Sequence, residues 1–170
     1  LCNAELREAN LENAVLSFAD LRGASLFRAN LAGVVCNDAL LIGANLREAN
    51  LAGADLRNSH LNDANLIKAN LSGANLEGMH NQSFTVLNLA NLEGANLTGA
   101  RLHCVSAEDA SFKHANLTGV DFSHAVLGGA ILRSANVTDA NFDGVELATV
   151  TMDFANFSAA RNAKIPFYKS

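Results

Sequence analysis

The side chains best suited to chemistry are three cysteines and five histidines: Cys2, Cys36, Cys104, His60, His80, His103, His114 and His124. Thiolate sulfur and imidazole nitrogen are the usual protein ligands of zinc. None of these residues stands in a Cys-x-x-Cys, His-Glu-x-x-His or comparable catalytic pattern along the chain. The residue types therefore allow a metal site, but only the fold can bring its members together.

The elements that must position these side chains follow from a repeat of five residues. Leucine occupies every fifth position over residues 1–76, with Cys36 as the one exception, and a small residue, usually Ala, lies two places before each. Residues 92–157 contain a second run of the same pattern. Helices need apolar spacings of three and four, and strands alternate every two residues, so a period of five fits neither. It predicts a backbone that turns after each short extended piece, with Leu46 and Leu117 pointing inward.

The repeat resembles a known family. Its consensus, Ala-(Asp/Asn)-Leu-x-x, is that of pentapeptide-repeat proteins, and it is matched by Ala9-Asn10-Leu11, Ala19-Asp20-Leu21, Ala69-Asn70-Leu71, Ala95-Asn96-Leu97 and Ala115-Asn116-Leu117. The resemblance implies an all-β fold, a right-handed quadrilateral β-helix in which four pentads form one square coil. Coils would stack at the inter-strand spacing of about 4.8 Å.

The resemblance also predicts the domain organisation. Residues 1–160 should form one solenoid of about eight coils. Residues 161–170 lose the repeat and supply Ile165, Pro166, Phe167 and Tyr168. Because a solenoid must cover the apolar core of its last coil, we expect this segment to be a C-terminal cap.

One break in register interrupts the repeat. Leu76 and Leu92 are sixteen residues apart, one more than three pentads, and residues 77–91 match the consensus poorly. We expect one inserted residue, or bulge, on a corner, because insertions in solenoids map to surface loops. The alternative is a recognition loop, since loops on rigid scaffolds often carry binding residues.

Residues twenty apart should be vertical neighbours, so the sequence predicts columns of like side chains. Asparagine ladders should hydrogen-bond coil to coil, hydroxyl groups should form a second ladder, and alternating charges should set the register. The expected columns are Asn10, Asn30, Asn50, Asn70 and Asn91; Asn75, Asn96, Asn116, Asn136 and Asn156; Thr98, Thr118, Thr138 and Ser158; and Glu8, Arg28, Glu48 and Lys68.

Large apolar residues at outward positions indicate a candidate interface. Phe18, Phe27, Ile42, Ile67 and Phe154 fall on positions that should face solvent. Aromatic residues and arginine are enriched at interface centres. The predicted interface consists of the column Arg7, Phe27, Arg47 and Ile67, with Phe18 and Ile42 as further members. Single exposed apolar side chains are also common, and that interpretation stays open.

The same columns place His103, Cys104, His124 and Asp143 on one face, with Cys104 directly below His124. These are zinc-ligand types. Parallel columns, however, aim side chains outward rather than toward one point, so we expect no metal and no cofactor, with zinc as the alternative. A core of Leu and Ala should leave no cavity, so we expect no enzyme. Cys36 occupies a core position and should be a buried, inert thiol.

The charge balance argues against nucleic-acid binding. Seventeen acidic residues oppose twelve basic ones, which gives a net charge of −5. Some pentapeptide-repeat proteins mimic duplex DNA and bind DNA gyrase or topoisomerase IV, which makes this the alternative function. A rod of about 40 Å would need on the order of 24 negative charges to copy the duplex. The available acidic patch consists of Asp139, Asp143, Glu146 and Asp153.

The sequence therefore predicts a non-enzymatic scaffold that binds an unidentified protein through its outer faces. No apolar stretch is long enough for a membrane span. An open coil end would allow a homodimer. Three widely spaced cysteines mildly favour a reducing, cytoplasmic compartment.

Overall fold

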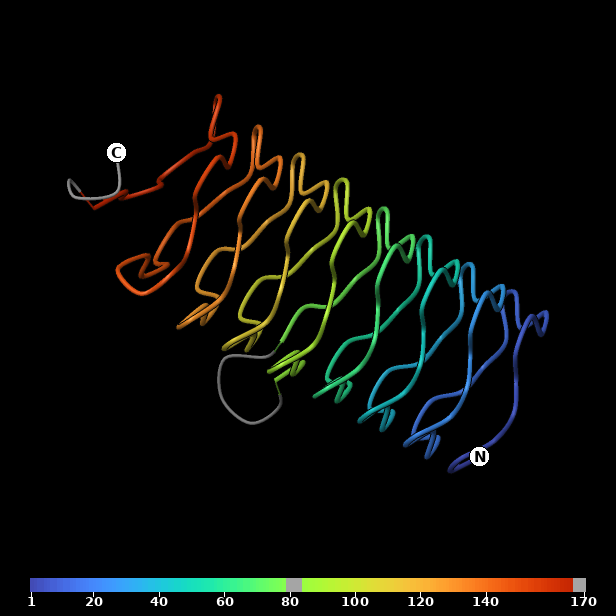
Figure 1. Ribbon diagram of the computed structural model, residues 1–170. Coiled ribbons are helices and arrows are strands. Elements are labelled where there is room, and N and C mark those ends of the chain that lie inside the picture. The colour runs from blue at the N-terminus through green and yellow to red at the C-terminus, as the bar shows by residue number, and fades with distance from the viewer. Residues whose placement is uncertain (79–83, 167–170) are drawn as a thin grey trace.

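The chain winds into a solenoid. The computed structural model describes residues 1–78 and 84–166, in which eight coils stack along one axis from the N-terminal to the C-terminal coil (Figure 1). The described residues contain no helix and no continuous strand, because each straight piece pairs with the next coil through a single residue. The predicted stack of about eight coils is confirmed, whereas its right-handed sense stays a prediction.

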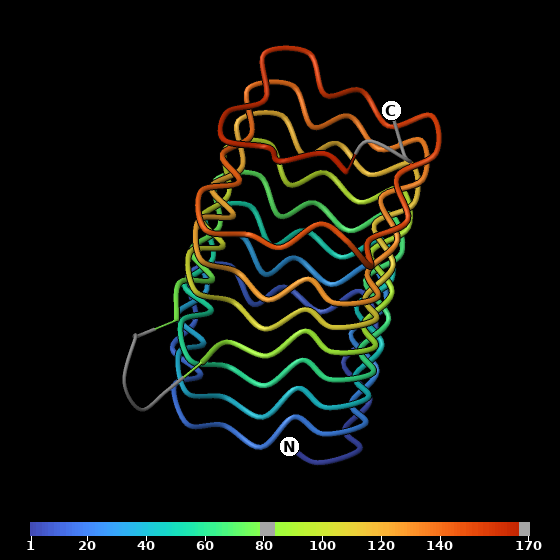
Figure 2. The same cartoon turned by 90° about the vertical axis from the view of Figure 1, so that its left-hand side faces the viewer.

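Each coil has four sides, and each side contributes one column of parallel β-bridges between consecutive coils. The first side is the column from Glu5 to Thr151 and the second is the column from Asn10 to Asn156. The third side runs from Val15 to Arg161 and the fourth from Asp20 to Val126. Figure 2 shows the coils lying in register along the stack.

The corners between the sides explain the polar part of the repeat. At a typical corner the Ala24 N–H donates to the Leu21 carbonyl at 3.0 Å, which closes a tight turn. The second turn residue is left-handed, as at Gly23 (φ +64°) and Asp38 (φ +57°). Glycine, asparagine and aspartate adopt this conformation most readily. The same φ occurs at the bulky Phe18 (60°) and Phe154 (58°), where it is unusual.

The interior is filled by the aliphatic side chains of the repeat. Leu46 and Leu117 are both 0% exposed, as the period of five predicts, and Cys36 is 2% exposed. Burying a leucine side chain contributes roughly 1.5–3 kcal/mol. Toward the C-terminus phenylalanines replace some of the leucines, and their rings form a chain of contacts with centroids 5.5–5.8 Å apart through Phe112, Phe122, Phe142 and Phe157.

The insertion adds six residues, not one. Elsewhere bridges join residues twenty apart, but His60 pairs with Val86, twenty-six residues on. The extra residues fall between Gly78 and Thr85. The regular backbone bonds between coils are present at these two residues, on either side of the insertion. A repeat of five defines an insertion only to within a multiple of five, so one and six extra residues leave the same register. This is why the predicted length was wrong.

The corrected length joins two predicted asparagine columns into one. Asn70 pairs with Asn96, and Asn91 pairs instead with Asn65 on the first side. We call the resulting column the asparagine side; it consists of Asn10, Asn30, Asn50, Asn70, Asn96, Asn116, Asn136 and Asn156. Over its first five members each Nδ2 donates to the Oδ1 of the preceding coil at 3.1–3.2 Å.

The predicted hydroxyl ladder is wrong in its partners. The Thr98, Thr118 and Thr138 hydroxyls donate sideways to Oδ1 of the asparagine two residues earlier at 2.6–2.7 Å. Nδ2 of Asn136 then donates to the Thr118 hydroxyl at 3.0 Å. The threonines lie in one column, as predicted, but their hydroxyls reinforce the asparagine side rather than bond to one another.

The C-terminal residues continue the last coil. Arg161 pairs with Asn141, and Ala163 and Ile165 are partly buried against the core. Phe167 and Tyr168 lie outside the described residues, so the boundary at 161–170 and its capping role stay predictions. No helix in the described ranges is long and apolar enough to cross a membrane.

Candidate functional site

The corner between the third and fourth sides carries two columns of unlike side chains. We call it the insertion corner, because the six extra residues enter there. Its two neighbouring columns are Ser17, Asn37, Arg57, Glu77, His103, Ser123 and Asp143, and Phe18, Asp38, Asn58, Gly78, Cys104, His124 and Gly144. No residue type repeats along either column as asparagine does on the second side.

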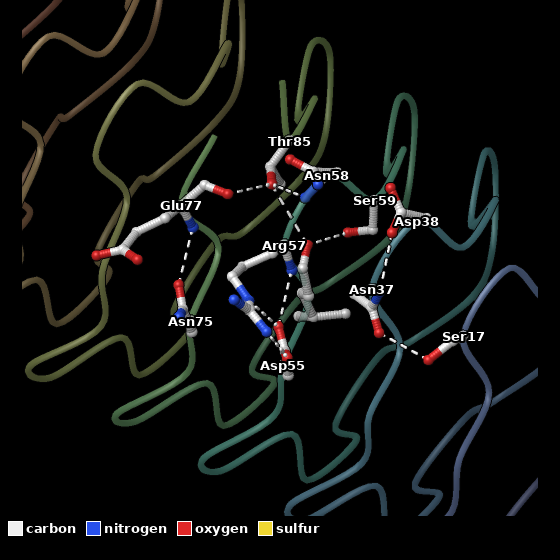
Figure 3. A network of polar contacts seen from close by, with 11 residues as sticks. Ser17, Asn37, Asp38, Asp55, Arg57, Asn58, Ser59, Asn75, Glu77 and Thr85 are labelled. Atoms are coloured by element: carbon white, nitrogen blue, oxygen red, sulfur yellow. Dashed lines mark hydrogen bonds and ion pairs between the residues drawn. The ribbon is translucent and has the colours of Figure 1, made fainter. Parts of the chain in front are cut away.

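Thr85 separates two coils at this corner. At neighbouring levels the corner N–H donates to a carbonyl of the next coil, as Asp38 does to Arg57 at 2.9 Å. At the next level the Asn58 N–H instead donates to the Thr85 hydroxyl at 2.8 Å (Figure 3). The carbonyl oxygens of Leu56 and Glu77 both lie 3.3 Å from that hydroxyl and share its single proton. One side-chain hydroxyl therefore replaces the regular inter-coil bond.

Gly78 permits the close packing above this opening. A β-carbon there would lie 2.6 Å from the Cys104 carbonyl oxygen, closer than real contacts allow. The regular two-residue turn is also absent at Glu77 and Gly78. Among the described residues, Gly78 places no side chain above Asn58, and the hollow spans three coils.

A hollow of about 260 Å³ occupies this opening and is lined by Asn37, Asp38, Arg57, Asn58 and Glu77. It corrects the expectation that the solenoid has no cavity: the core is packed, and the hollow lies outside it on the corner. In Figure 3 the lining side chains come from three successive coils. Sequence reasoning missed the hollow because it depends on the lost turn.

Two charged groups beside the hollow neutralise each other. Arg57 donates through Nε and an Nη to the two oxygens of Asp55 at 2.8 and 2.6 Å. The hydrogen bond from Arg57 lowers the pKa of the Asp55 carboxyl, and Asp55 raises the pKa of Arg57. Arg57 is therefore held by its own coil. Asp38 accepts from a neutral group, the Asn37 amide, at 2.8 Å.

One polar atom in this corner is unsatisfied. The Asn58 Oδ1 is buried and has no hydrogen-bond partner in the described structure. Such an atom is rare, because burial removes water without replacing its hydrogen bonds. The sequence did carry a signal here: Ser59 and Thr85 replace the usual Ala of the repeat and are both 0% exposed. Buried hydroxyls at alanine positions mark a distorted coil.

The histidines and Cys104 lie farther along the same corner. The Cys104 Sγ is 3.2 Å from His103 Nε2, and His103 Nδ1 is 2.9 Å from the Ser123 hydroxyl. The His103 and His124 rings meet edge to face, with centroids 5.6 Å apart. Burial raises the pKa of the Cys104 thiol, which disfavours the thiolate that zinc needs.

The zinc alternative therefore lacks its geometry. Across residues 1–78 and 84–166, no group of three or more His, Cys, Asp or Glu side chains could hold one metal ion. His103, Cys104, His124 and Asp143 do share the insertion corner, but they do not converge on a common centre. Burial likewise raises the pKa of the Cys36 thiol in the core, to about 12.

The predicted interface column lies on the corner between the first and second sides. Arg7, Phe27, Arg47 and Ile67 are stacked there through the backbone bonds of their coils. Phe27 is only partly exposed, because the guanidinium carbons of Arg7 and Arg28 lie 5.1 and 4.8 Å from its ring centre.

The two further members of that prediction, Ile42 and Phe18, lie on other corners. Ile67 and Ile42 are half-buried, and Ile42 sits beside the fourth side. Phe18 is 76% exposed and lies on the insertion corner, diagonally across the coil from Phe27. The six predicted interface residues therefore do not form one surface.

The acidic residues near the C-terminus are also dispersed. Asp139 lies between the second and third sides, Asp143 on the insertion corner, and Asp153 between the first and second sides. Glu146 follows Asp143 and lines a smaller hollow of about 170 Å³ together with Lys164. Asp153 lies 3.7 Å from the Arg133 guanidinium. These carboxylates do not form a continuous stripe.

Comparison with known proteins agrees with the repeat. A family model described as pentapeptide repeats matches eight copies over residues 1–33, 39–78, 83–113 and 110–148. A comparison with curated proteins gives no match.

Two solved structures resemble this chain over most of its length. HetL, a pentapeptide repeat protein involved in heterocyst differentiation regulation in the cyanobacterium Nostoc sp. strain PCC 7120, is 34% identical; the match covers 94% of this chain and 72% of HetL, with a TM-score of 0.70. Full-length QnrB1, a plasmid-mediated fluoroquinolone resistance protein, is 17% identical; the match covers 95% of this chain and 91% of QnrB1, with a TM-score of 0.65. At that identity QnrB1 supports the fold alone.

Proposed function

Because the chain belongs to the pentapeptide-repeat family, we propose that it is a non-enzymatic scaffold that binds another protein through the insertion corner. The observation that carries this proposal is the break in the repeat. A hollow lined by charged and amide side chains lies at this break, and the exposed Phe18 lies one coil below Asp38, which lines the hollow. An aromatic ring next to charged and amide groups is the composition that interface centres favour.

The asparagine side also supports the choice of the insertion corner as the binding surface. On the asparagine side the amide groups already bond to one another and to backbone N–H groups, such as that of Ser72, at 3.2 Å. Groups that are satisfied within the fold gain little from a partner. The exposed ring of Phe18 and the unsatisfied Asn58 Oδ1 are not saturated in this way.

Affinity capture with two matched double variants tests the proposal. The first variant, Phe18→Ser/Asp38→Asn, changes the insertion corner. The control, Phe154→Ser/Asp63→Asn, changes an exposed phenylalanine and an exposed aspartate on other corners, with the same left-handed φ and the same change of charge. We expect specific proteins to be lost from the first variant and kept by the control. Identical capture by both variants would reject the insertion corner as the binding surface.

The column predicted from sequence provides a competing surface for the same function. Phe27→Ser/Ile67→Ser would remove its two apolar members, while Arg7 and Arg47 remain. We expect this variant to capture the same proteins as the parent. Loss of those proteins here, with retention by Phe18→Ser/Asp38→Asn, would move the interaction to this other corner.

The alternative of DNA mimicry has weaker support. The acidic residues Asp139, Asp143 and Asp153 lie on three different corners, and the net charge is −5. We expect neither inhibition of gyrase supercoiling nor rescue from a quinolone at micromolar protein. Either effect would favour the mimic over the scaffold.

A further inference from the structure

We propose that the hollow at the insertion corner receives the guanidinium group of an arginine side chain from the partner protein. This inference rests on the proposed function, because it specifies the chemistry of the same surface. The volume of about 260 Å³ is well above the roughly 30 Å³ that one water molecule occupies in the liquid. The hollow is therefore large enough for a side-chain head group.

The lining offers hydrogen-bond acceptors that lack strong donors. The Asn58 Oδ1 is buried without a partner in the described structure, so it marks the distorted coil but is out of reach of a group in the hollow. The Asp38 carboxylate is bonded to the neutral Asn37 amide, at 2.8 Å. A guanidinium group carries five N–H donors on a planar fork, so one group can donate to both oxygens of a carboxylate.

The charges around the hollow favour a cation. Asp38, Asp55 and Glu77 supply three carboxylates against the single guanidinium of Arg57. Arg57 is held in a two-bond pair by Asp55, so it is not free to bind an anionic group. Glu77 lies 3.5 Å from the exposed Arg101, so part of its negative charge is neutralised. The Asp38 carboxylate is therefore the main charge that a ligand in the hollow must balance. The Asp38 carboxylate would repel an anionic ligand.

An inorganic cation fits the lining less well. In the described residues no three His, Cys, Asp or Glu side chains approach one point closely enough to coordinate a metal ion. Divalent cations need short oxygen contacts of about 2.0–2.6 Å from several ligands at once. In Figure 3 the polar groups of the corner are spread over successive coils, which suits an extended organic cation better.

Phe18 adds a second contact for such a cation. Its ring is 76% exposed at the level below Asp38 on the same column. The molecule already pairs arginine with phenylalanine in this way: the guanidinium carbon of Arg28 lies 4.8 Å from the Phe27 ring centre. Guanidinium groups stack favourably on aromatic faces at this distance. An arginine side chain bound in the hollow can therefore contact both the Phe18 ring and the Asp38 carboxylate.

Nuclear magnetic resonance titration tests the proposal without an identified partner. The probe is N-acetyl-arginine amide, and N-acetyl-citrulline amide is its neutral isostere. We expect saturable shifts in the millimolar range at the side-chain amides of Asn37 and Asn58, with at least tenfold weaker binding of the citrulline probe. Asp38→Asn should weaken arginine binding at least fivefold, whereas the matched Asp63→Asn should leave it unchanged.

A gain-of-function variant protects the test against misfolding. Asn37→Asp keeps the size of the side chain and adds a carboxylate to the lining of the hollow, so it should bind the arginine probe severalfold more tightly. Equal shifts with arginine and citrulline, or no change on Asn37→Asp, would overturn the arginine site. That result would leave the capture experiment unaffected, so failure of this inference and failure of the scaffold function can be told apart.

Discussion

The asparagine side and the insertion corner use the same backbone repeat in opposite ways. On the asparagine side eight identical residues stack, and six of their Nδ2 groups donate to the preceding coil. On the insertion corner no residue type occurs more than twice in a column, the Asn58 N–H bonds to a side chain, and the Asn58 Oδ1 has no partner among the described residues. Repetition therefore stabilises the stack, and departure from repetition leaves groups available for recognition.

The difference has a simple physical origin. Coils are spaced at the inter-strand distance of about 4.8 Å, at which identical amides can donate upward and accept downward. A column of unlike side chains cannot form such a ladder, so each residue must find local partners. Arg57 and Asp55 do so within one coil.

The largest effect should come from the hydroxyl that opens the insertion corner. Thr85→Val keeps the shape of the side chain but leaves the Asn58 N–H and the Glu77 carbonyl without their bonds. We expect the free energy of unfolding to fall by about 2–3 kcal/mol, measured by urea unfolding. The control is Thr98→Val, whose exposed hydroxyl bonds only to Asn96 among the bonds described. An equal loss in both variants would show that Thr85 has no special role.

The asparagine side should be the next most sensitive region. Asn70→Ala removes three hydrogen bonds, to Asn50, Asn96 and the Ser72 N–H. Each net bond contributes about 1 kcal/mol, and partial exposure reduces the sum, so we expect a loss of about 1–2 kcal/mol in urea. Unchanged stability would contradict the view that this column holds the coils together.

The ion pair beside the hollow should contribute less, with a defined pH dependence. The folded pKa of Asp55 is lowered below 3.8, chiefly by its hydrogen bond to Arg57. Its stabilisation is therefore present above about pH 4 and is lost as the pH falls through the folded value. Asp55→Asn should lose up to about 1 kcal/mol at pH 7. Thermal unfolding of both proteins between pH 7 and 3 should show this difference shrinking, and a constant difference would contradict the assignment.

The smallest effect should come from removing the unsatisfied group itself. Asn58→Gly deletes the orphan Oδ1 and keeps a residue that adopts the left-handed φ of 58°. We expect stability within about 0.5 kcal/mol of the parent, because a removed desolvation penalty offsets the added flexibility of glycine. A loss as large as that of Asn70→Ala would mean that Asn58 has a structural partner after all.

The sequence predicts the parts of the molecule that repeat. The inward positions of Leu46 and Leu117 follow from the period alone, because only alternate small and large residues fill a narrow core. The length of the insertion does not follow, since the period leaves multiples of five undetermined. That ambiguity also misplaced Asn91, which belongs to the first side.

The candidate site could be predicted only in outline. The break near residues 77–91 marks the right place, and Ser59 and Thr85 at alanine positions would have indicated buried hydroxyls. The hollow itself depends on the lost turn at Gly78 and on how Thr85 bonds between coils, which no local pattern encodes. Phe18 was included among the interface residues, but its position beside Asp38 and Asn58 required the stacked coils.

Hydroxyl-radical footprinting of the chain alone and with its captured partner tests the central claim most directly. Phe18 on the insertion corner and Phe154 on another corner are 76% and 89% exposed, so both should be oxidised in the free chain. We predict that partner binding reduces oxidation of Phe18 severalfold and leaves Phe154 unchanged. Unaltered oxidation of Phe18 with protection of Phe154 would contradict recognition through the insertion corner.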